Sequence, residues 1–383
     1  SFCRPSADPN RTTTHPSMIS WTRRRGAALF ALAVLASLTA AGCQPPDTPT
    51  PASADARIRF PQGSGGVNQP EHRDAPYLVL LSLDGFRWDY QDLFHTPNLD
   101  RIAAAGVRAD GLIPVFPVKT FPNHYSIATG MYTDAHGLVG NDFCEPAFGA
   151  CYSLGNRAEV ENPRWYGGEP IWVTAETQGM VSASYFFVGT EAPVMGVQPT
   201  EWHRFDDGVT YEARVERVLE WLALPPETRP HLVTFYFEET DTRGHNYPTD
   251  APEMRASVEL VDRLVGRLLD GIAALPHGEE VHVIVVSDHG MGGFTAERTY
   301  FLADLLELGD GVDVRGTGSH MVLYVDGDDA RKDALRDELA AVLPRAAVYR
   351  VGDLPERLHY ARAGARLGDI VIVPDFGLSL IHI

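Results

Sequence analysis

Long apolar runs, each followed at once by polar residues, recur along the chain and predict buried strands. The three clearest cover residues 77–83, 232–237 and 281–287. Because these runs lack the alternation of a half-exposed strand, they are typical of parallel sheets with both faces covered. Between the second and third runs, residues 253–272 place their apolar side chains on one helical face. The order strand, helix, strand predicts a right-handed βαβ unit and hence an α/β fold.

Two helix signals complete the first part of this framework. Residues 96–105 predict a helix, and Gly106 is a suitable C-cap for it. Pro122 suits the first turn of another helix. We therefore expect Thr120 at a helix N-terminus, where unpaired N–H groups favour anions.

A second strand–helix–strand pattern lies toward the carboxyl end, at residues 321–325, 329–342 and 347–351. It predicts a small α+β lobe, about 312–368, that packs beside the main sheet. The last six residues, LSLIHI, match the translation of a transposase adapter used in preparing sequencing libraries. We therefore interpret residues 75–377 as an incomplete main domain and 378–383 as an adapter artefact.

The first 74 residues have a different composition. Met18, three arginines at 23–25 and an apolar run at 27–41 predict an export signal, and residues 1–17 are interpreted as non-native upstream translation. The segment Ala-Ala-Gly-Cys that ends at Cys43 resembles a bacterial lipobox. We expect lipidation of Cys43, with ordinary signal cleavage nearby as the alternative. Residues 44–74 are rich in Pro, Ser and Gly and predict a flexible tether. These features predict a protein of the periplasm or cell surface, lipid-anchored to the bacterial outer membrane.

Charge and size limit the function classes. The chain has 383 residues, of which 44% are hydrophobic, so it can bury a sizeable core. Its net charge of −19 argues against a nucleic-acid polymer as partner, because such proteins bind polyanions through a broad basic surface. A small phosphorylated ligand can still be held by local cations.

The cysteines are consistent with an exported protein. Cys144 and Cys151 are close enough in sequence to close a small surface loop. In an oxidising compartment we expect them to form a disulfide. A zinc pair is the alternative, although no further Cys or His accompanies them at finger spacing.

The candidate chemistry lies at or near the ends of the predicted strands. Open α/β sheets place their functional side chains at the carboxyl ends of the strands. Six residues of ligand or nucleophile type occur there: Asp84, Thr120, Asp241, His245, Asp288 and His289. Asp and His are oxygen and nitrogen ligands for zinc, and two close zinc ions suit phosphoryl transfer. A metal-activated threonine would then be the nucleophile of a phosphate-ester hydrolase.

Six motifs carry a resemblance to a known family. They run from about Tyr77 to Asp375: LSLDGFRWDY, TPNLDRIAAAGV, FPVKTFPNHYSIATGMYTDAHGLVGND, NPRWYGGEPIWVTAE, RPHLVTFYFEETDTRGH and VVSDHGM. In this order they resemble the nucleotide pyrophosphatase/phosphodiesterase (type I phosphodiesterase) family of the alkaline phosphatase superfamily. The resemblance implies an α/β/α sandwich around a mostly parallel sheet.

The resemblance also implies a two-zinc site. The first zinc would be held by Asp84, Thr120, Asp288 and His289. The second would be held by Asp241 and His245, together with a histidine from a C-terminal motif that this chain lacks. His382 belongs to the adapter-like end and does not replace it. We therefore expect this chain to be weak or inactive, although its parent protein is expected to be active.

Further residues match substrate-binding positions of the family. Asn141 would donate to a phosphate oxygen, with a turn residue before Asp142 as the alternative. Phe121 and Phe205 would stack on the nucleobase, although core packing is an equally good reading of Phe205. Neither His124 nor His136 has a motif partner that would make it a ligand, so both are interpreted as structural.

The implied activity is hydrolysis of nucleotide phosphodiester or pyrophosphate bonds to nucleoside 5′-monophosphates, through a covalent threonyl intermediate. Two alternatives stay open. A phosphodiesterase for lipid head groups of the choline type would have the same fold. A non-catalytic lipoprotein that binds a phosphorylated ligand belongs to a different class, and the intact Thr120 argues against it.

Overall fold

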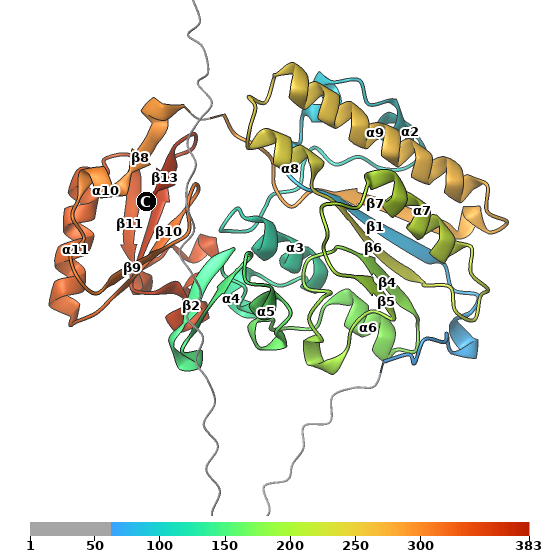
Figure 1. Ribbon diagram of the computed structural model, residues 1–383, viewed down its shortest axis with the longest axis horizontal. Coiled ribbons are helices and arrows are strands. Elements are labelled where there is room, and N and C mark those ends of the chain that lie inside the picture. The colour runs from blue at the N-terminus through green and yellow to red at the C-terminus, as the bar shows by residue number, and fades with distance from the viewer. Residues whose placement is uncertain (1–62, 294, 383) are drawn as a thin grey trace, which may run out of the picture. The chain divides into compact units, whose positions relative to one another are not determined.

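A five-stranded parallel sheet lies at the centre of the larger part of the protein (Figure 1). The computed structural model describes residues 63–293 and 295–382, so the predicted export signal, Cys43 and most of the predicted tether lie outside the described residues. The strand order is β5-β4-β6-β1-β7. The strand bounds are β1 (Tyr77–Leu83), β4 (Ser182–Tyr185), β5 (Glu201–His203), β6 (Leu232–Phe237) and β7 (Val281–Val286).

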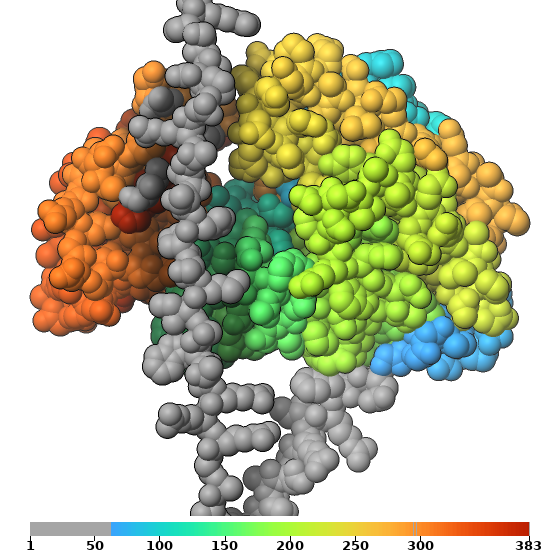
Figure 2. Space-filling model, in the orientation of Figure 1, coloured from blue at the N-terminus to red at the C-terminus, as the bar shows by residue number. Residues whose placement is uncertain are grey.

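The two faces of this sheet are covered by different helices. Successive side chains of a strand point to opposite faces. Val79 and Leu81 of β1 pack with apolar residues of α7 and α9, whereas Leu80 packs with residues of α3 and α6. Figure 2 shows the residues of α7 and α9 forming the outer surface over their part of the sheet. These layers confirm the predicted α/β/α sandwich around a parallel sheet.

The helices agree closely with the sequence pattern. The apolar face predicted for 253–272 is buried along α9, and α2 begins after Thr96 and ends before Gly106, its C-cap. None of the helices within the described residues is long and apolar enough to cross a membrane. The helix bounds are α1 (Tyr90–Leu93), α2 (Pro97–Ala105), α3 (Thr120–Thr129), α4 (Thr133–His136), α5 (Arg157–Val160), α6 (Ile171–Thr177), α7 (Tyr211–Leu222), α8 (Glu239–Gly244), α9 (Pro252–Ala273), α10 (Leu302–Leu305) and α11 (Asp329–Val342).

The predicted small lobe is built on an antiparallel sheet with the order β11-β12-β10-β9. Its strands are β9 (Val312–Arg315), β10 (Met321–Val325), β11 (Ala346–Arg350) and β12 (Ile370–Pro374). Because β12 lies between β10 and β11, the predicted strand–helix–strand unit is split by a third strand. The lobe therefore extends past the expected boundary at 368. In the adapter-like end, β13 (Ser379–Ile381) pairs with β8 (Thr299–Phe301).

The predicted tether is shorter than expected, because residues 63–74 pack against segments that adjoin the main sheet. Asn68 is fully buried, and its side chain donates to the carbonyls of Pro226 and Arg229 and accepts from Val181 N–H. A short 3-10 helix follows at Pro70–His72. Composition alone predicted a flexible segment, but this asparagine satisfies three buried backbone groups and so fixes the chain there.

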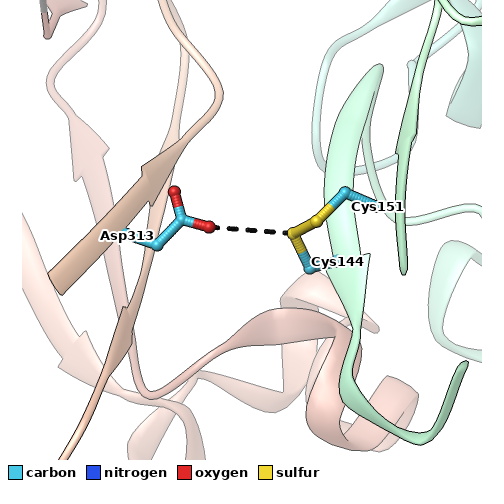
Figure 3. Close-up of side chains that lie close together, drawn as sticks. All are labelled: Cys144, Cys151 and Asp313. Atoms are coloured by element: carbon cyan, nitrogen blue, oxygen red, sulfur yellow. Dashed lines mark hydrogen bonds between the residues drawn. A yellow bond between two sulfur atoms is a disulfide. The ribbon is translucent and has the colours of Figure 1, made fainter. Parts of the chain in front are cut away.

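A hairpin of β2 (Asp142–Glu145) and β3 (Ala150–Ser153) carries the disulfide between Cys144 and Cys151 (Figure 3). The Asp313 carboxylate of the lobe lies 3.8 Å from Cys144 Sγ. Since a disulfide sulfur has neither a hydrogen to donate nor a thiolate to offer a cation, this approach is a van der Waals contact and not a metal site.

We expect reduction of this disulfide to destabilise the protein. The bond closes a short loop, and loop-closure entropy then predicts a loss of about 2–3 kcal/mol in the free energy of unfolding. Urea unfolding of the Cys151→Ser variant against the oxidised protein measures this loss. A mass of the unreduced protein that shows two free thiols would contradict the bond itself.

Candidate functional site

Four segments meet at the carboxyl edge of the main sheet. Asp84 follows β1, the segment of Asp241 follows β6, and Asp288 follows β7, and these three strands are neighbours in the sheet. Thr120 is the first residue of α3, as its N-terminal position predicted. Gly85 allows the segment after β1 to lie close to the backbone of Asp241. It has φ +67°, and a Cβ there would lie 2.9 Å from Asp241 Cα.

His289 is the centre of this cluster. Its Nε2 lies 3.1 Å from Asp288 Oδ2, 3.5 Å from Asp84 Oδ1 and 3.4 Å from Thr120 Oγ1. Its other ring nitrogen, Nδ1, lies 3.0 Å from the Gly290 carbonyl oxygen. Because a carbonyl only accepts, Nδ1 carries the hydrogen and the Nε2 lone pair faces the cluster.

Each buried carboxylate has one oxygen fixed by the protein. The Tyr236 hydroxyl donates to Asp84 Oδ2 at 2.6 Å, and Gly85 N–H donates to Asp288 Oδ1 at 3.3 Å. The other two oxygens, Asp84 Oδ1 and Asp288 Oδ2, are buried without a hydrogen-bond partner among the described residues. His289 lies close to both, but the approaches lack hydrogen-bond geometry. Buried carboxylate oxygens without donors are suited to holding a cation.

The charges of the two carboxylates support the same conclusion. Burial raises the pKa of Asp84 well above its ordinary value, and the neighbouring carboxylates of Asp288 and Asp241 raise it further. Burial would also raise the pKa of Asp288, but His124 and His289 bring it down to about 2. Without a cation, the Asp84 and Asp288 carboxylates therefore favour a single negative charge between them. A bound cation would stabilise the charge on both.

The distances from His289 Nε2 to its three neighbours are those expected between ligands of one tetrahedral metal ion. Ligand atoms about 2.0–2.1 Å from a tetrahedral zinc are roughly 3.3–3.4 Å apart. The distances from His289 Nε2 to its three neighbours are 3.1 to 3.5 Å. Asp84, Thr120, Asp288 and His289 could therefore hold one divalent cation.

Asp241 and His245 form a second pair beside the first group. Asp241 lies in α8 and His245 is the C-cap of this helix, so the helix aligns the two side chains. His245 Nε2 is 3.4 Å from Asp241 Oδ1, and this hydrogen bond raises the pKa of His245. Ligand atoms of Asp241, Asp84 and His289 all lie within 4.8 Å of one another. Of the second pair, Asp241 belongs to this group of three, whereas the largely exposed His245 lies beside Asp241 outside it.

Asn141 and Phe121 are next to the candidate nucleophile. Asn141 Oδ1 accepts from Phe121 N–H at 3.1 Å, which fixes the amide. Across the part of the chain that the structure describes, no hydrogen bond uses Asn141 Nδ2, so its two hydrogens remain as donors. The Phe121 ring packs 6.1 Å from that of Tyr152.

Phe205 is more exposed than a core residue. Its side chain is 38% exposed, and its ring packs against the edges of Phe186 and Tyr236. A ring that packs against two others and is still partly exposed is suited to stacking on a ligand. Of the two interpretations of Phe205, core packing is therefore the weaker one.

Three residues near the site were not predicted from the sequence as functional. Tyr236 is hidden in the apolar run LVTFYF. Lys119 is the N-cap of α3, and burial lowers its pKa, an effect that the nearby Asp241 carboxylate only partly offsets. His124 was interpreted as structural but lies 3.3 Å from Asp288 Oδ2. A polar residue inside an apolar strand was the one available signal for Tyr236.

His136, in contrast, is a satisfied structural residue. It is buried, its Nδ1 accepts from Leu138 N–H at 3.1 Å, and its Nε2 lies 2.9 Å from Ser126 Oγ. Nδ1 must therefore stay unprotonated. Burial accordingly lowers the pKa of His136 to about 4.

We expect this histidine to make the protein acid-sensitive. Because its pKa is lowered in the folded state, the unfolded chain binds more protons between pH 6.5 and 4, and stability falls as pH falls through that window. The loss at pH 5 relative to pH 8 is about 2 kcal/mol from this group. Urea unfolding of wild type and His136→Asn at both pH values should show a smaller pH effect in the variant. An equal pH effect in both proteins would contradict the assignment.

Comparison with known proteins agrees with this geometry. Residues 78–382 match the family model described as type I phosphodiesterase / nucleotide pyrophosphatase. The chain is 38% identical over 244 residues to ectonucleotide pyrophosphatase/phosphodiesterase family member 1 of Homo sapiens, covering 62% of this chain and 26% of the human protein. It is 33% identical over 370 residues to an uncharacterised pyrophosphatase/phosphodiesterase of Schizosaccharomyces pombe, covering 94% of this chain and 74% of the yeast protein.

Solved structures give the same result. The murine ectonucleotide pyrophosphatase/phosphodiesterase 5 matches with a TM-score of 0.74 and 29% identity, covering 80% of both chains. The same holds for its inactive variant with a threonine-to-alanine substitution, solved in complex with AMP. The chain spans only 26% of the human relative and 37% of a Crotalus durissus collilineatus venom phosphodiesterase. On the family model and these relatives, the chain belongs to the type I phosphodiesterase / nucleotide pyrophosphatase family.

Proposed function

We propose that the protein is a two-zinc phosphodiesterase that hydrolyses nucleotide phosphodiester or pyrophosphate bonds and releases nucleoside 5′-monophosphates. The observation that carries this proposal is the position of the Thr120 hydroxyl. It lies 3.4 Å from His289 Nε2, within a set of carboxylate and imidazole groups whose spacing fits a cation. A hydroxyl in that position is a candidate nucleophile and not merely a helix-end residue.

In the proposed reaction, Thr120 Oγ1 gives up its proton to solvent and attacks phosphorus, and the bond from phosphorus to the leaving oxygen breaks, so that this oxygen leaves with the bonding electron pair. A nucleotidyl group is then bound covalently to Thr120. Water attacks the same phosphorus, the bond to Thr120 breaks, and a nucleoside 5′-monophosphate leaves. When bound, divalent cations would lower the pKa of the threonine hydroxyl and offset the charge on the phosphate.

Several side chains of this protein are arranged to hold the substrate. Asn141, fixed through its Oδ1, has Nδ2 donors for a non-bridging phosphate oxygen. The α3 N-terminus, which starts at Thr120, favours negative charge at the same place. Phe121 and the partly exposed Phe205 offer aromatic faces for a base, and stacking of this kind tolerates every base.

The relatives support the nucleotide assignment. One structural neighbour was solved with AMP, in an inactive variant in which threonine is replaced by alanine. That combination supports a threonine as nucleophile and a nucleoside monophosphate as product in this chain as well.

We also propose that the protein is exported and anchored through a lipid on Cys43. The export signal and the lipobox-like segment motivate this localisation. The disulfide between Cys144 and Cys151 supports it, because such bonds persist in oxidising compartments. Metabolic labelling with a fatty acid, compared between wild type and Cys43→Ser, tests the anchor.

Substrate preference tests the function. With zinc in excess, we expect kcat/KM for p-nitrophenyl thymidine 5′-monophosphate to exceed that for p-nitrophenyl phosphate at least tenfold. A ratio is used so that a low absolute rate does not hide the preference. Preference for the monoester would overturn the diesterase assignment, and preference for p-nitrophenyl phosphorylcholine would indicate the lipid head-group alternative.

A further inference from the structure

The buried histidine His124 contacts three parts of the site at once. Its ring is fully buried in the first turns of α3. Nε2 lies 2.8 Å from Ser82 Oγ on β1, and Nδ1 lies 2.8 Å from the Thr120 carbonyl oxygen. Nδ1 is also 3.3 Å from Asp288 Oδ2, which follows β7. One side chain therefore joins the nucleophile helix to the two strands that carry the buried carboxylates.

The hydrogen-bond partners determine which nitrogen of His124 carries the hydrogen. The Thr120 carbonyl oxygen can only accept, so Nδ1 is the donor, and Nε2 accepts from the Ser82 hydroxyl. The same nitrogen lies close to the Asp288 carboxylate, 3.3 Å from its Oδ2, without hydrogen-bond geometry. Donor and acceptor are both used, as buried polar groups require.

Two aromatic rings hold the imidazole in this orientation. Phe187 and Tyr236 both approach it edge to face, with centroids 5.4 and 5.3 Å from that of His124. The same Tyr236 donates its hydroxyl to Asp84 Oδ2. The ring that fixes His124 thus also fixes the second buried carboxylate, and the two carboxylates are oriented by one packed unit.

We propose that His124 is a positioning residue that sets the Thr120 hydroxyl and the Asp288 carboxylate at the separation that the cation and the reacting phosphate require. This inference rests on the proposed function. His124 does not touch the substrate; it acts through the Thr120 backbone and the Asp288 side chain. Groups that orient metal ligands typically change metal affinity 10- to 100-fold when they are lost, and a nucleophile displaced by about 1 Å costs roughly 100-fold in rate.

The test compares variants that keep or remove the donor. His124→Leu removes it, whereas His124→Asn keeps an N–H near the Nδ1 position. We expect His124→Leu to lower Zn²⁺ affinity, measured by chelator competition, by about 10- to 100-fold and kcat by at least tenfold, with KM within about twofold. His124→Asn should recover most of both losses. The absorption spectrum of the Co²⁺-loaded protein should change in His124→Leu and stay close to wild type in His124→Asn.

His136 provides the matched control. It is also buried and bonded to a serine, but it contacts none of the site residues discussed above. His136→Leu should therefore lower stability while Zn²⁺ affinity and kcat stay near wild type.

Three results would overturn the inference while leaving the proposed function standing. The first is unchanged Zn²⁺ affinity and kcat in His124→Leu. The second is an equal loss of both in His124→Asn and His124→Leu. The third is an equal loss of both in His136→Leu and His124→Leu. If His124→Leu does not fold, Ser82→Ala decides: we expect a 3- to 10-fold loss in kcat, because Nε2 loses its donor, and an unchanged kcat would overturn the inference. A wild-type protein that neither binds Zn²⁺ nor cleaves the diester would overturn the proposed function and this inference together.

Discussion

Replacing Thr120 by alanine is expected to lower kcat by at least about 10³-fold while the protein still folds and binds metal. The hydroxyl lies within the cluster around His289, and no other hydroxyl contacts His289 Nε2 among the described residues. Stability should change little, because the Thr120 hydroxyl caps no backbone N–H and the residue is only half-buried at the start of α3. Single-turnover hydrolysis of p-nitrophenyl thymidine 5′-monophosphate, with circular dichroism and metal analysis of the same sample, measures all three properties.

Thr120→Ser is the matched control for this prediction. Serine keeps the hydroxyl and removes only a methyl group, so we expect activity within about tenfold of wild type. Acid quenching should trap a nucleotidyl group on wild type and on Thr120→Ser but not on Thr120→Ala. Substantial turnover by the alanine variant would sink the nucleophile assignment.

Two strands of the main sheet were predictable from continuous hydrophobicity alone. The runs at Tyr77–Leu83 and Leu232–Phe237 are buried on both faces, so continuous hydrophobicity identified them as parallel strands. The small lobe was only half predictable, since β12 inserts between two strands that are separated from it in sequence. Such pairing depends on contacts that no local pattern contains. Residues 63–74 were missed because their order comes from the buried side chain of Asn68.

The positions of the candidate ligands were predictable from the sequence, whereas the groups that orient them were not. Asp84 and Asp288 follow strands, and strand ends meet at one edge of a parallel sheet. Ser82 and Tyr236, in contrast, are partners across β1 and β6, and both sit inside apolar runs. That these two polar residues are neighbours can be recognised only once the pairing register of the two strands is known. His124 was interpreted as structural because its partners are a backbone carbonyl and a residue far away in the sequence.

Replacing Asp84 by asparagine is expected to separate metal binding from stability. Asparagine keeps an oxygen for the Tyr236 hydroxyl but lacks the charge that a cation needs. We therefore expect Zn²⁺ affinity to fall at least about 100-fold and turnover to fall with it. Removing the metal from wild type with a chelator should also abolish turnover, and added Zn²⁺ should restore it in wild type but not in the variant.

The metal-free variant, however, should be at least as stable as metal-free wild type. Burial and the neighbouring carboxylates make a charge at Asp84 unfavourable without a cation, and asparagine removes that charge. Asp262→Asn is the control, because Asp262 is equally buried but accepts from Asn98 and Leu99 N–H at the start of α2. It should lose about 1–3 kcal/mol of stability and keep its Zn²⁺ affinity. If Asp84→Asn instead unfolds readily and binds Zn²⁺ as wild type does, Asp84 is a structural residue and the metal site lies elsewhere.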